Sequence, residues 1–188
     1  MKLKIPTSVF LLSFVFIFTA FGAVSAAEKK PQDILAAKYP NEVVRVIKTE
    51  DINSDKKKET FIITESGNFF LINSKGILVL IDTGIGIYEG EELNLFTYSV
   101  TAKEKHVGIT IDYLPSNTQL YVYRLQNGTL KKSLQLIGDY GVDIDKKGRV
   151  HQYWKDYKEE GGWDLAHGIF TWNTKTNKYK GTGDFVLE

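Results

Sequence analysis

Oxygen-bearing side chains recur at short, regular intervals in one polar stretch of the chain, residues 51–59, DINSDKKKE. Positions 1, 3, 5 and 9 of this stretch are occupied by Asp51, Asn53, Asp55 and Glu59. Calcium is a hard ion that takes about six or more oxygen ligands. Alternate residues of a tight loop can direct their side chains to one centre, and the backbone carbonyl of Lys57 can add another oxygen. The spacing therefore predicts a calcium site in this loop.

The residues on both sides of this loop favour β-strands. The segments Val43–Lys48 and Glu59–Glu65 are rich in β-branched and aromatic residues, which suit a pleated and half-buried surface. We therefore expect a strand, a polar loop and a second strand, with the loop oxygens directed inward.

The pattern Asp-x-Asn-x-Asp-x-x-x-Glu between two strands resembles the calcium hairpin of FG-GAP/VCBS-type repeats, which build integrin-like β-propellers and occur in many secreted bacterial proteins. The resemblance covers Val43–Ile81, and Phe170–Tyr179 is similar to the closing aromatic hairpin of such repeats. It implies that the oxygens at the matching positions bind the ion, namely those of Asp51, Asn53, Asp55 and Glu59. The sixth loop position is normally glycine in the family, because the backbone there is left-handed, whereas this chain has Lys56.

Lys56 leaves two interpretations of the loop open. A residue other than glycine costs on the order of 1 kcal/mol in a left-handed conformation. The segment Lys56–Lys58 also places three positive charges beside the proposed ion. The loop is therefore either a weak structural calcium site or a solvated hairpin loop that keeps the shape without the ion.

The N-terminal segment has the three parts of a secretory signal. Lys2 and Lys4 precede an apolar stretch over residues 9–24, and small residues follow at the cleavage positions. We expect residues 1–26 to be a cleaved signal peptide rather than a membrane anchor, and residues 27–188 to form one extracellular domain. The chain has no cysteine, which excludes a lipid-anchored lipoprotein, disulfides, thiolate zinc sites and thiol catalysis.

The charge balance excludes some partners. Two of the 24 Lys and Arg residues leave with the signal peptide, which leaves 22 against 23 Asp and Glu residues. A nucleic-acid-binding domain needs a basic face, so we expect no nucleic-acid partner. We also expect no membrane contact once the signal peptide is removed.

From Glu42 onward, the sequence is typical of an all-β protein. Short runs of β-branched and aromatic residues alternate with turn residues, and Asn127–Gly128 is the strongest hairpin signal. We expect an antiparallel meander of about ten to twelve strands that forms a sandwich, a barrel or a partial propeller. One short helix is expected at Pro31–Tyr39, where Pro31 suits the first turn and Pro40 ends the helix.

Two of the predicted strands are apolar on both faces. Ile77–Ile81 is apolar throughout, and Gln119–Leu125 carries apolar residues at odd and even positions alike. A strand of this kind is usually covered on both sides. We therefore expect both strands to lie between other layers.

Aromatic and acidic residues are concentrated in the C-terminal third of the chain. Exposed aromatic rings recur in binding sites, and four residues are candidates for a non-catalytic sugar- or peptide-binding face: Tyr153, Trp154, Trp163 and Trp172. The same residues are equally suited to the core. Two carboxylates beside aromatic rings would also outline a sugar-cleaving site, and the candidates are Asp143, Asp145 and Asp156.

Together, these features predict a secreted bacterial binding or structural module without catalytic residues. Its partner would be an extracellular protein or a carbohydrate surface, and calcium would have a structural role. The alternative is a secreted hydrolase that acts on cell-wall or polysaccharide material through the C-terminal carboxylates.

Overall fold

Three four-stranded sheets follow one another along the chain. The computed structural model describes residues 29–87 and 90–184. The first sheet comprises β1 (Val44–Glu50), β2 (Glu59–Thr64), β3 (Phe69–Ile72) and β4 (Leu78–Asp82). The second sheet comprises β5 (Glu92–Thr101), β6 (Glu104–Tyr113), β7 (Asn117–Gln126) and β8 (Thr129–Gly138). The third sheet comprises β9 (Val142–Ile144), β10 (Val150–Tyr157), β11 (Trp163–Asn173) and β12 (Lys178–Gly183).

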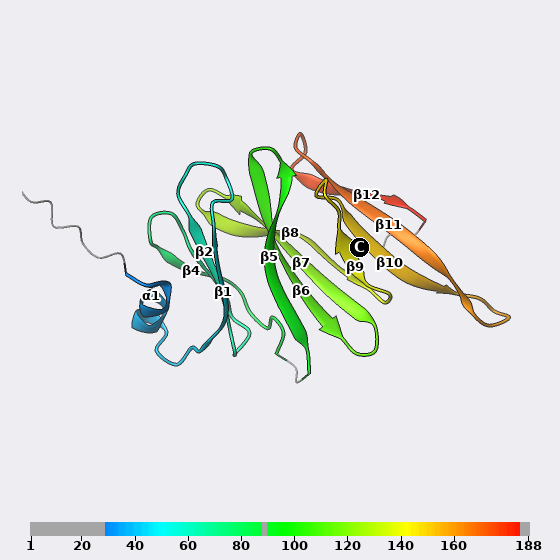
Figure 1. Cartoon of the computed structure of the whole chain (residues 1–188), viewed down its shortest axis with the longest axis horizontal. Helices are drawn as coiled ribbons and strands as arrows, with labels where there is room; N and C mark the ends of the chain where they lie inside the picture. Colours follow the sequence, from blue (N-terminus) through cyan, green and yellow to red (C-terminus); the bar gives the residue numbers. More distant parts are fainter. Residues whose placement is uncertain (1–28, 88–89, 185–188) are drawn as a thin grey trace, which may run out of the picture.

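Each sheet is an antiparallel meander, because every strand pairs with its neighbours in sequence. The sheets lie side by side, with the second between the first and the third (Figure 1). Each keeps two edge strands, and none of the described sheets closes on itself. The predicted all-β meander is therefore confirmed, as an open, sandwich-like stack.

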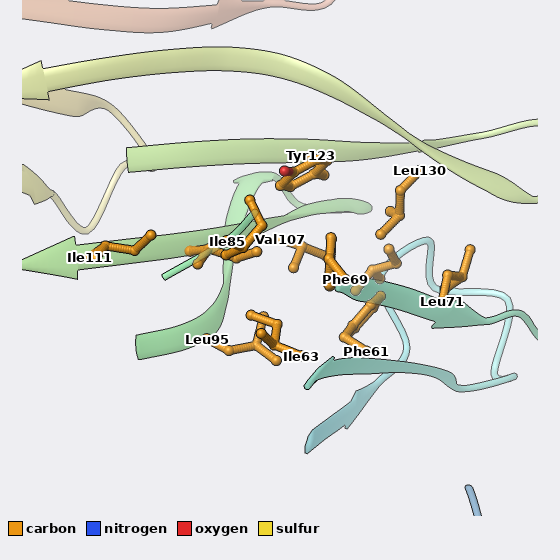
Figure 2. Close-up of a cluster of buried hydrophobic side chains, with 12 residues drawn as sticks. Phe61, Ile63, Phe69, Leu71, Ile85, Leu95, Val107, Ile111, Tyr123 and Leu130 are labelled. Carbon is orange, nitrogen blue, oxygen red and sulfur yellow. The ribbon is translucent and has the colours of Figure 1, made fainter. Parts of the chain in front are cut away.

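The interface between the first two sheets is a large apolar cluster (Figure 2). Phe61, Ile63 and Phe69 contribute from the first sheet, and Val107 and Tyr123 from the second. The rings of Phe69 and Tyr123 are 4.9 Å apart between centroids. All five side chains are at most 1% exposed, so this cluster joins the two sheets.

A second cluster joins the second sheet to the third. Leu120 and Val122 of β7 pack with Val150 and Phe170. Tyr123 of the same strand points into the first cluster. Both faces of β7 are thus covered, and the prediction for residues 119–125 is confirmed.

Helix α1 (Pro31–Lys38) covers the far side of the first sheet. Leu35 is 1% exposed and packs in a cluster with Ile62 and Phe70. Pro31 stands in the first turn, and the helix stops just before Pro40, as predicted. The helix thereby removes an apolar sheet face from water.

The prediction that Ile77–Ile81 is covered on both sides is wrong. Ile77 is 54% exposed and Leu80 is 42% exposed. The segment forms β4, which is an edge strand and lacks the cover that central strands receive. The strands buried along their whole length are the two central ones, β2 and β3, although β2 begins with Glu59 and Thr60.

β11 is longer than expected. The sequence predicts a strand over Ile169–Trp172, whereas β11 starts at Trp163 and pairs with the whole of β10. Asp164, His167 and Gly168 interrupt the apolar pattern and hide its first half. The resulting β10–β11 hairpin extends past the rest of the molecule at the lower right of Figure 1.

The predicted signal peptide, residues 1–26, lies outside the described residues. Within the described parts of the chain, no helix combines the length and apolar character needed to cross a membrane.

Candidate functional site

The loop between β1 and β2 turns around its own side-chain oxygens. Asp51 Oδ2 accepts a hydrogen bond from the backbone N–H of Lys56 at 2.9 Å. Asn53 Oδ1 accepts from Asp55 N at 3.1 Å, and Asp55 Oδ1 accepts from Lys57 N at 2.8 Å. The oxygens therefore point into the loop, as a cation site requires.

Lys56 takes the left-handed conformation that glycine usually supplies at this position. Its φ is 67°, and Ser54 is also left-handed at 61°. The conformation costs on the order of 1 kcal/mol at a residue with a Cβ, and the hydrogen bond to Asp51 offsets part of that cost. The departure from the family pattern is thus accommodated in the backbone.

Glu59 closes the loop and is 1% exposed. Its Oε2 accepts a hydrogen bond from the backbone N–H of Ile52 at 3.5 Å, and it forms no ion pair with any described residue. Burial raises the pKa of its carboxyl group, and the negative charges of Asp55 and Asp51 raise it further. A buried carboxylate without a cation is unfavourable, and a divalent ion would correct this.

The donor set suits calcium in its chemistry, because all the predicted ligands are oxygens. Among the described residues, however, no three His, Cys, Asp or Glu side chains are grouped so that they could hold a metal ion. The predicted set also relies on the amide of Asn53 and the carbonyl of Lys57. Ion binding would therefore require the loop to contract.

The same loop is attached to the second sheet. Ile52 is 1% exposed and belongs to the first apolar cluster. Its carbonyl accepts a hydrogen bond from Lys105 N at 2.8 Å, and the hydroxyl of Ser54 is 3.5 Å from the carbonyl of Lys103. Stabilising the loop should therefore also stabilise the interface between these sheets.

The four aromatic candidates are divided between the two faces of the third sheet. Trp172 faces the second sheet, is 8% exposed and meets His106 edge to face with centroids 4.6 Å apart. Trp154 pairs with the buried Ala166 and shares its side of the sheet. Tyr153 and Trp163 occupy alternate positions and lie on the opposite side.

That opposite side carries exposed rings. The Tyr153 and His167 rings stack at 4.7 Å with a 9° interplanar angle. Trp163 packs against Tyr140 at 5.2 Å and is 41% exposed, and Tyr157 is 67% exposed. We refer to this surface as the outer face and define it by Tyr140, Tyr153, Tyr157, Trp163, Leu165 and His167.

The two ends of the stack differ. The far side of the first sheet is covered by α1, whereas no element in the described residues covers the outer face of the third sheet (Figure 1). An exposed cluster of large apolar side chains often marks an interaction site. The outer face is therefore the main candidate for binding.

A buried polar network, which the sequence did not indicate, connects the second and third sheets. His106 is fully buried, and its Nδ1 lies 2.8 Å from the Tyr179 hydroxyl. That hydroxyl is 2.7 Å from the hydroxyl of Tyr98. Burial lowers the pKa of His106 to about 4, so the imidazole is neutral near pH 7. In the sequence, only one feature indicates where His106 points. It is adjacent to Val107 on β6, and because side chains alternate along a strand, it must point away from the first cluster.

The carboxylates of the hydrolase hypothesis are only partly brought together. Asp143 and Asp145 line a cavity of about 340 Å³ with Phe96 and Tyr98. The backbone N–H and guanidinium of Arg149 hold the pKa of Asp145 well below its usual range. Asp143 is level with residue 151 of β10, so Asp156 lies on the order of 16 Å farther along that strand.

Comparison with protein-family models, with curated proteins and with solved structures finds no match to this chain. The resemblance to FG-GAP/VCBS-type repeats therefore stays a prediction from Val43–Ile81 and Phe170–Tyr179.

Proposed function

We propose that this protein is an extracellular, non-catalytic module that binds a carbohydrate surface through the outer face of its third sheet. One observation carries the proposal: α1 covers one end of the stack, while the other end presents exposed aromatic rings. An exposed apolar face of this size on a soluble domain often marks the site where a partner binds.

The chemistry of the outer face suits sugar rings. Aromatic side chains offer a flat apolar surface together with a hydroxyl or N–H at the edge, which matches the apolar faces and hydroxyl rim of a sugar. Tyr153 stacks on His167, and Tyr157 lies directly opposite Trp163 across the hairpin. The two pairs are about 13 Å apart along β10, at about 3.3 Å per residue, which leaves room for more than one sugar ring.

Calcium has a structural place in this proposal. The oxygens of Asp51, Asn53, Asp55 and Glu59, with the carbonyl of Lys57, would hold the ion. The support is the buried Glu59 carboxylate, which has no cationic partner among the described residues. A bound ion would neutralise this charge and order a loop that contacts the second sheet, so its free energy of binding would add to folding stability.

The hydrolase alternative has less support. A general acid needs a raised pKa, whereas Arg149 holds Asp145 in its ionised form. Asp156 is exposed and lies opposite Asp164 near the end of the hairpin. The cavity that Asp143 and Asp145 line does not include Asp156.

Co-sedimentation with insoluble polysaccharides tests the proposal. The panel would include cellulose, chitin, xylan and peptidoglycan. Wild-type protein should sediment with at least one of them, and the double variant Trp163→Ala/Tyr157→Ala should stay in solution. Ile77→Ala is the matched control, because Ile77 is 54% exposed, between the 41% of Trp163 and the 67% of Tyr157, but lies at the edge of the first sheet. Retention by no polysaccharide, or equal retention of the double variant, would contradict the proposal.

A further inference from the structure

A cleft of about 610 Å³ lies between the second and third sheets, on the side away from the outer face. Its walls come from β7 and β8 on one side and from β11 and β12 on the other. The volume is within the usual range for small-ligand pockets. We call it the intersheet cleft, and the residues that matter here are Arg124, Lys131, Trp172 and Lys178.

The charge of the intersheet cleft is one-sided. Its walls contain four cationic side chains and no Asp or Glu. Two of the four are paired with carboxylates outside the cleft: Lys132 lies 2.8 Å from Asp82, and Arg124 lies 2.6 Å from Glu104. Lys131 and Lys178 are exposed and form no ion pair with any described residue. The cleft therefore keeps unbalanced positive charge.

Arg124 holds its guanidinium in a fixed position at the cleft wall. Its Nε donates to Glu104 Oε1 at 2.6 Å, and the group lies 5.2 Å from the ring centroid of Trp172. Its two terminal nitrogens form no hydrogen bond to any described residue. Lys131 is its direct neighbour across β7 and β8. A planar guanidinium beside an ammonium group is well suited to an oxyanion.

Trp172 supplies an independent observation. Its side chain is 8% exposed, and its Nε1 is buried without a hydrogen-bond partner among the described residues. Buried N–H groups are nearly always paired in folded proteins. Trp172 also lines the cleft, so its indole N–H signal should report on an anion that binds beside the ring.

We propose that the intersheet cleft is a second ligand site, which takes an oxyanion: a phosphate, sulfate or carboxylate group. The anion would contact Arg124, Lys131 and Lys178 and lie beside the Trp172 ring. The site is separate from the outer face, because Trp172 and Trp163 lie on opposite sides of the third sheet. If the experiment on one site gives a negative result, the proposal for the other site is therefore unaffected.

NMR titration can observe this site directly. The chain has three tryptophans, so it gives three indole N–H signals, which Trp→Phe variants assign. Inorganic phosphate, inorganic sulfate and acetate are added separately at constant ionic strength. The Trp172 signal should shift and saturate with at least one anion, and the anion that acts identifies the group the site prefers. The Trp163 signal should stay in place.

Charge-reversal variants complete the test. Lys131→Glu and Lys178→Glu should each lower the affinity for the anion that shifts the Trp172 signal by at least about tenfold. Lys146→Glu is the matched control, because Lys146 is exposed on the β9–β10 turn and lies outside the cleft. The backbone spectrum reports that each variant is folded. No saturable shift with any of the three anions, or equal affinities in the cleft variants and the control, would overturn the proposal.

Discussion

The Nδ1 atom of His106 lies 2.8 Å from the hydroxyl of Tyr179, and this contact joins the second sheet to the third. The two residues come from β6 and β12, which are far apart in sequence. Trp172 packs against both rings, at 4.6 Å from His106 and 5.2 Å from Tyr179. A polar contact inside an otherwise apolar interface favours one arrangement of the two sheets.

The buried His106 should make the protein sensitive to acid. Its pKa is lowered from 6.5 to about 4 in the folded state, so the unfolded chain takes up a proton first as the pH falls. Stability should drop by about 3 kcal/mol between pH 6.5 and pH 4 through this group. Chemical denaturation of the wild type and of His106→Phe at several pH values measures this, and the variant should lose less stability over the same range.

Tyr179→Phe is the control for that experiment. It removes the hydroxyl that faces His106 but leaves the imidazole buried. It should cost about 1 kcal/mol near pH 7 and keep the acid sensitivity. If the wild type and His106→Phe depend on pH in the same way, the imidazole is not the acid-sensitive group.

Calcium should raise the melting temperature through Glu59. At a concentration about ten times Kd, a ligand that binds only the folded form adds about 1.4 kcal/mol, which corresponds to about 3–6 °C for a chain of this size. Differential scanning fluorimetry with calcium and with chelator measures the shift. The Glu59→Gln variant should show none, whereas Glu65→Gln, at an exposed position, should respond like the wild type.

The pH dependence without calcium gives a second check on Glu59. Because its pKa is raised above 4.5 in the folded state, stability through this group is present at low pH and decreases as the pH rises past that value. Glu59→Gln should remove this decrease. An unchanged pH profile, together with no calcium effect in the wild type, would leave only the solvated hairpin loop.

Gly148, in the turn between β9 and β10, should be harder to replace than Gly161, in the turn between β10 and β11. The φ of Gly148 is 73°, and a Cβ there would overlap the carbonyl oxygen of Ser99 on β5. Gly148→Ala should therefore cost more than about 2 kcal/mol, from backbone strain and steric overlap together. Gly161→Ala introduces backbone strain alone, because no heavy atom lies within 4 Å of a Cβ at this position. It should lower the free energy of unfolding by about 1 kcal/mol. Equal costs from urea denaturation would contradict the predicted contact with β5.

Leu35→Ala should uncover the far side of the first sheet. Leu35 is 1% exposed against Ile62 and Phe70, and removing a buried leucine side chain costs about 2–5 kcal/mol. Urea denaturation measures the loss. Gln32→Ala, an exposed position on the same helix, should change stability by less than about 0.5 kcal/mol. A similar result for both variants would mean that α1 does not hold its place through Leu35.

Local chemistry explains which elements the sequence predicts. Asn127 and Gly128 both have positive φ, at 53° and 76°, as a two-residue hairpin turn requires. The burial of Ile77–Ile81 depended instead on which strands lie beside it. Composition cannot distinguish an edge strand from a central one, so that prediction was wrong.

The aromatic candidates show where the sequence reached its limit. Tyr153 and Trp154 are adjacent on one strand and must point to opposite faces. Trp163 and Trp172 differ by an odd number of residues along β11, so they separate in the same way. The sequence did not reveal that Trp163 and Trp172 lie on opposite faces, because the first half of β11 was not predicted to be a strand. The His106–Tyr179 contact had no local pattern at all, since it depends on how two sheets pack.

The affinity of Trp163→Ala for the polysaccharide that retains the wild-type protein tests the central claim most directly. Trp163 lies on the outer face, 41% exposed and packed on Tyr140, and the loss of an aromatic anchor from a binding surface costs about 2 kcal/mol or more. Depletion isotherms should show an affinity at least about thirtyfold weaker, with an unchanged melting temperature. An unchanged affinity in this variant would contradict binding through the outer face.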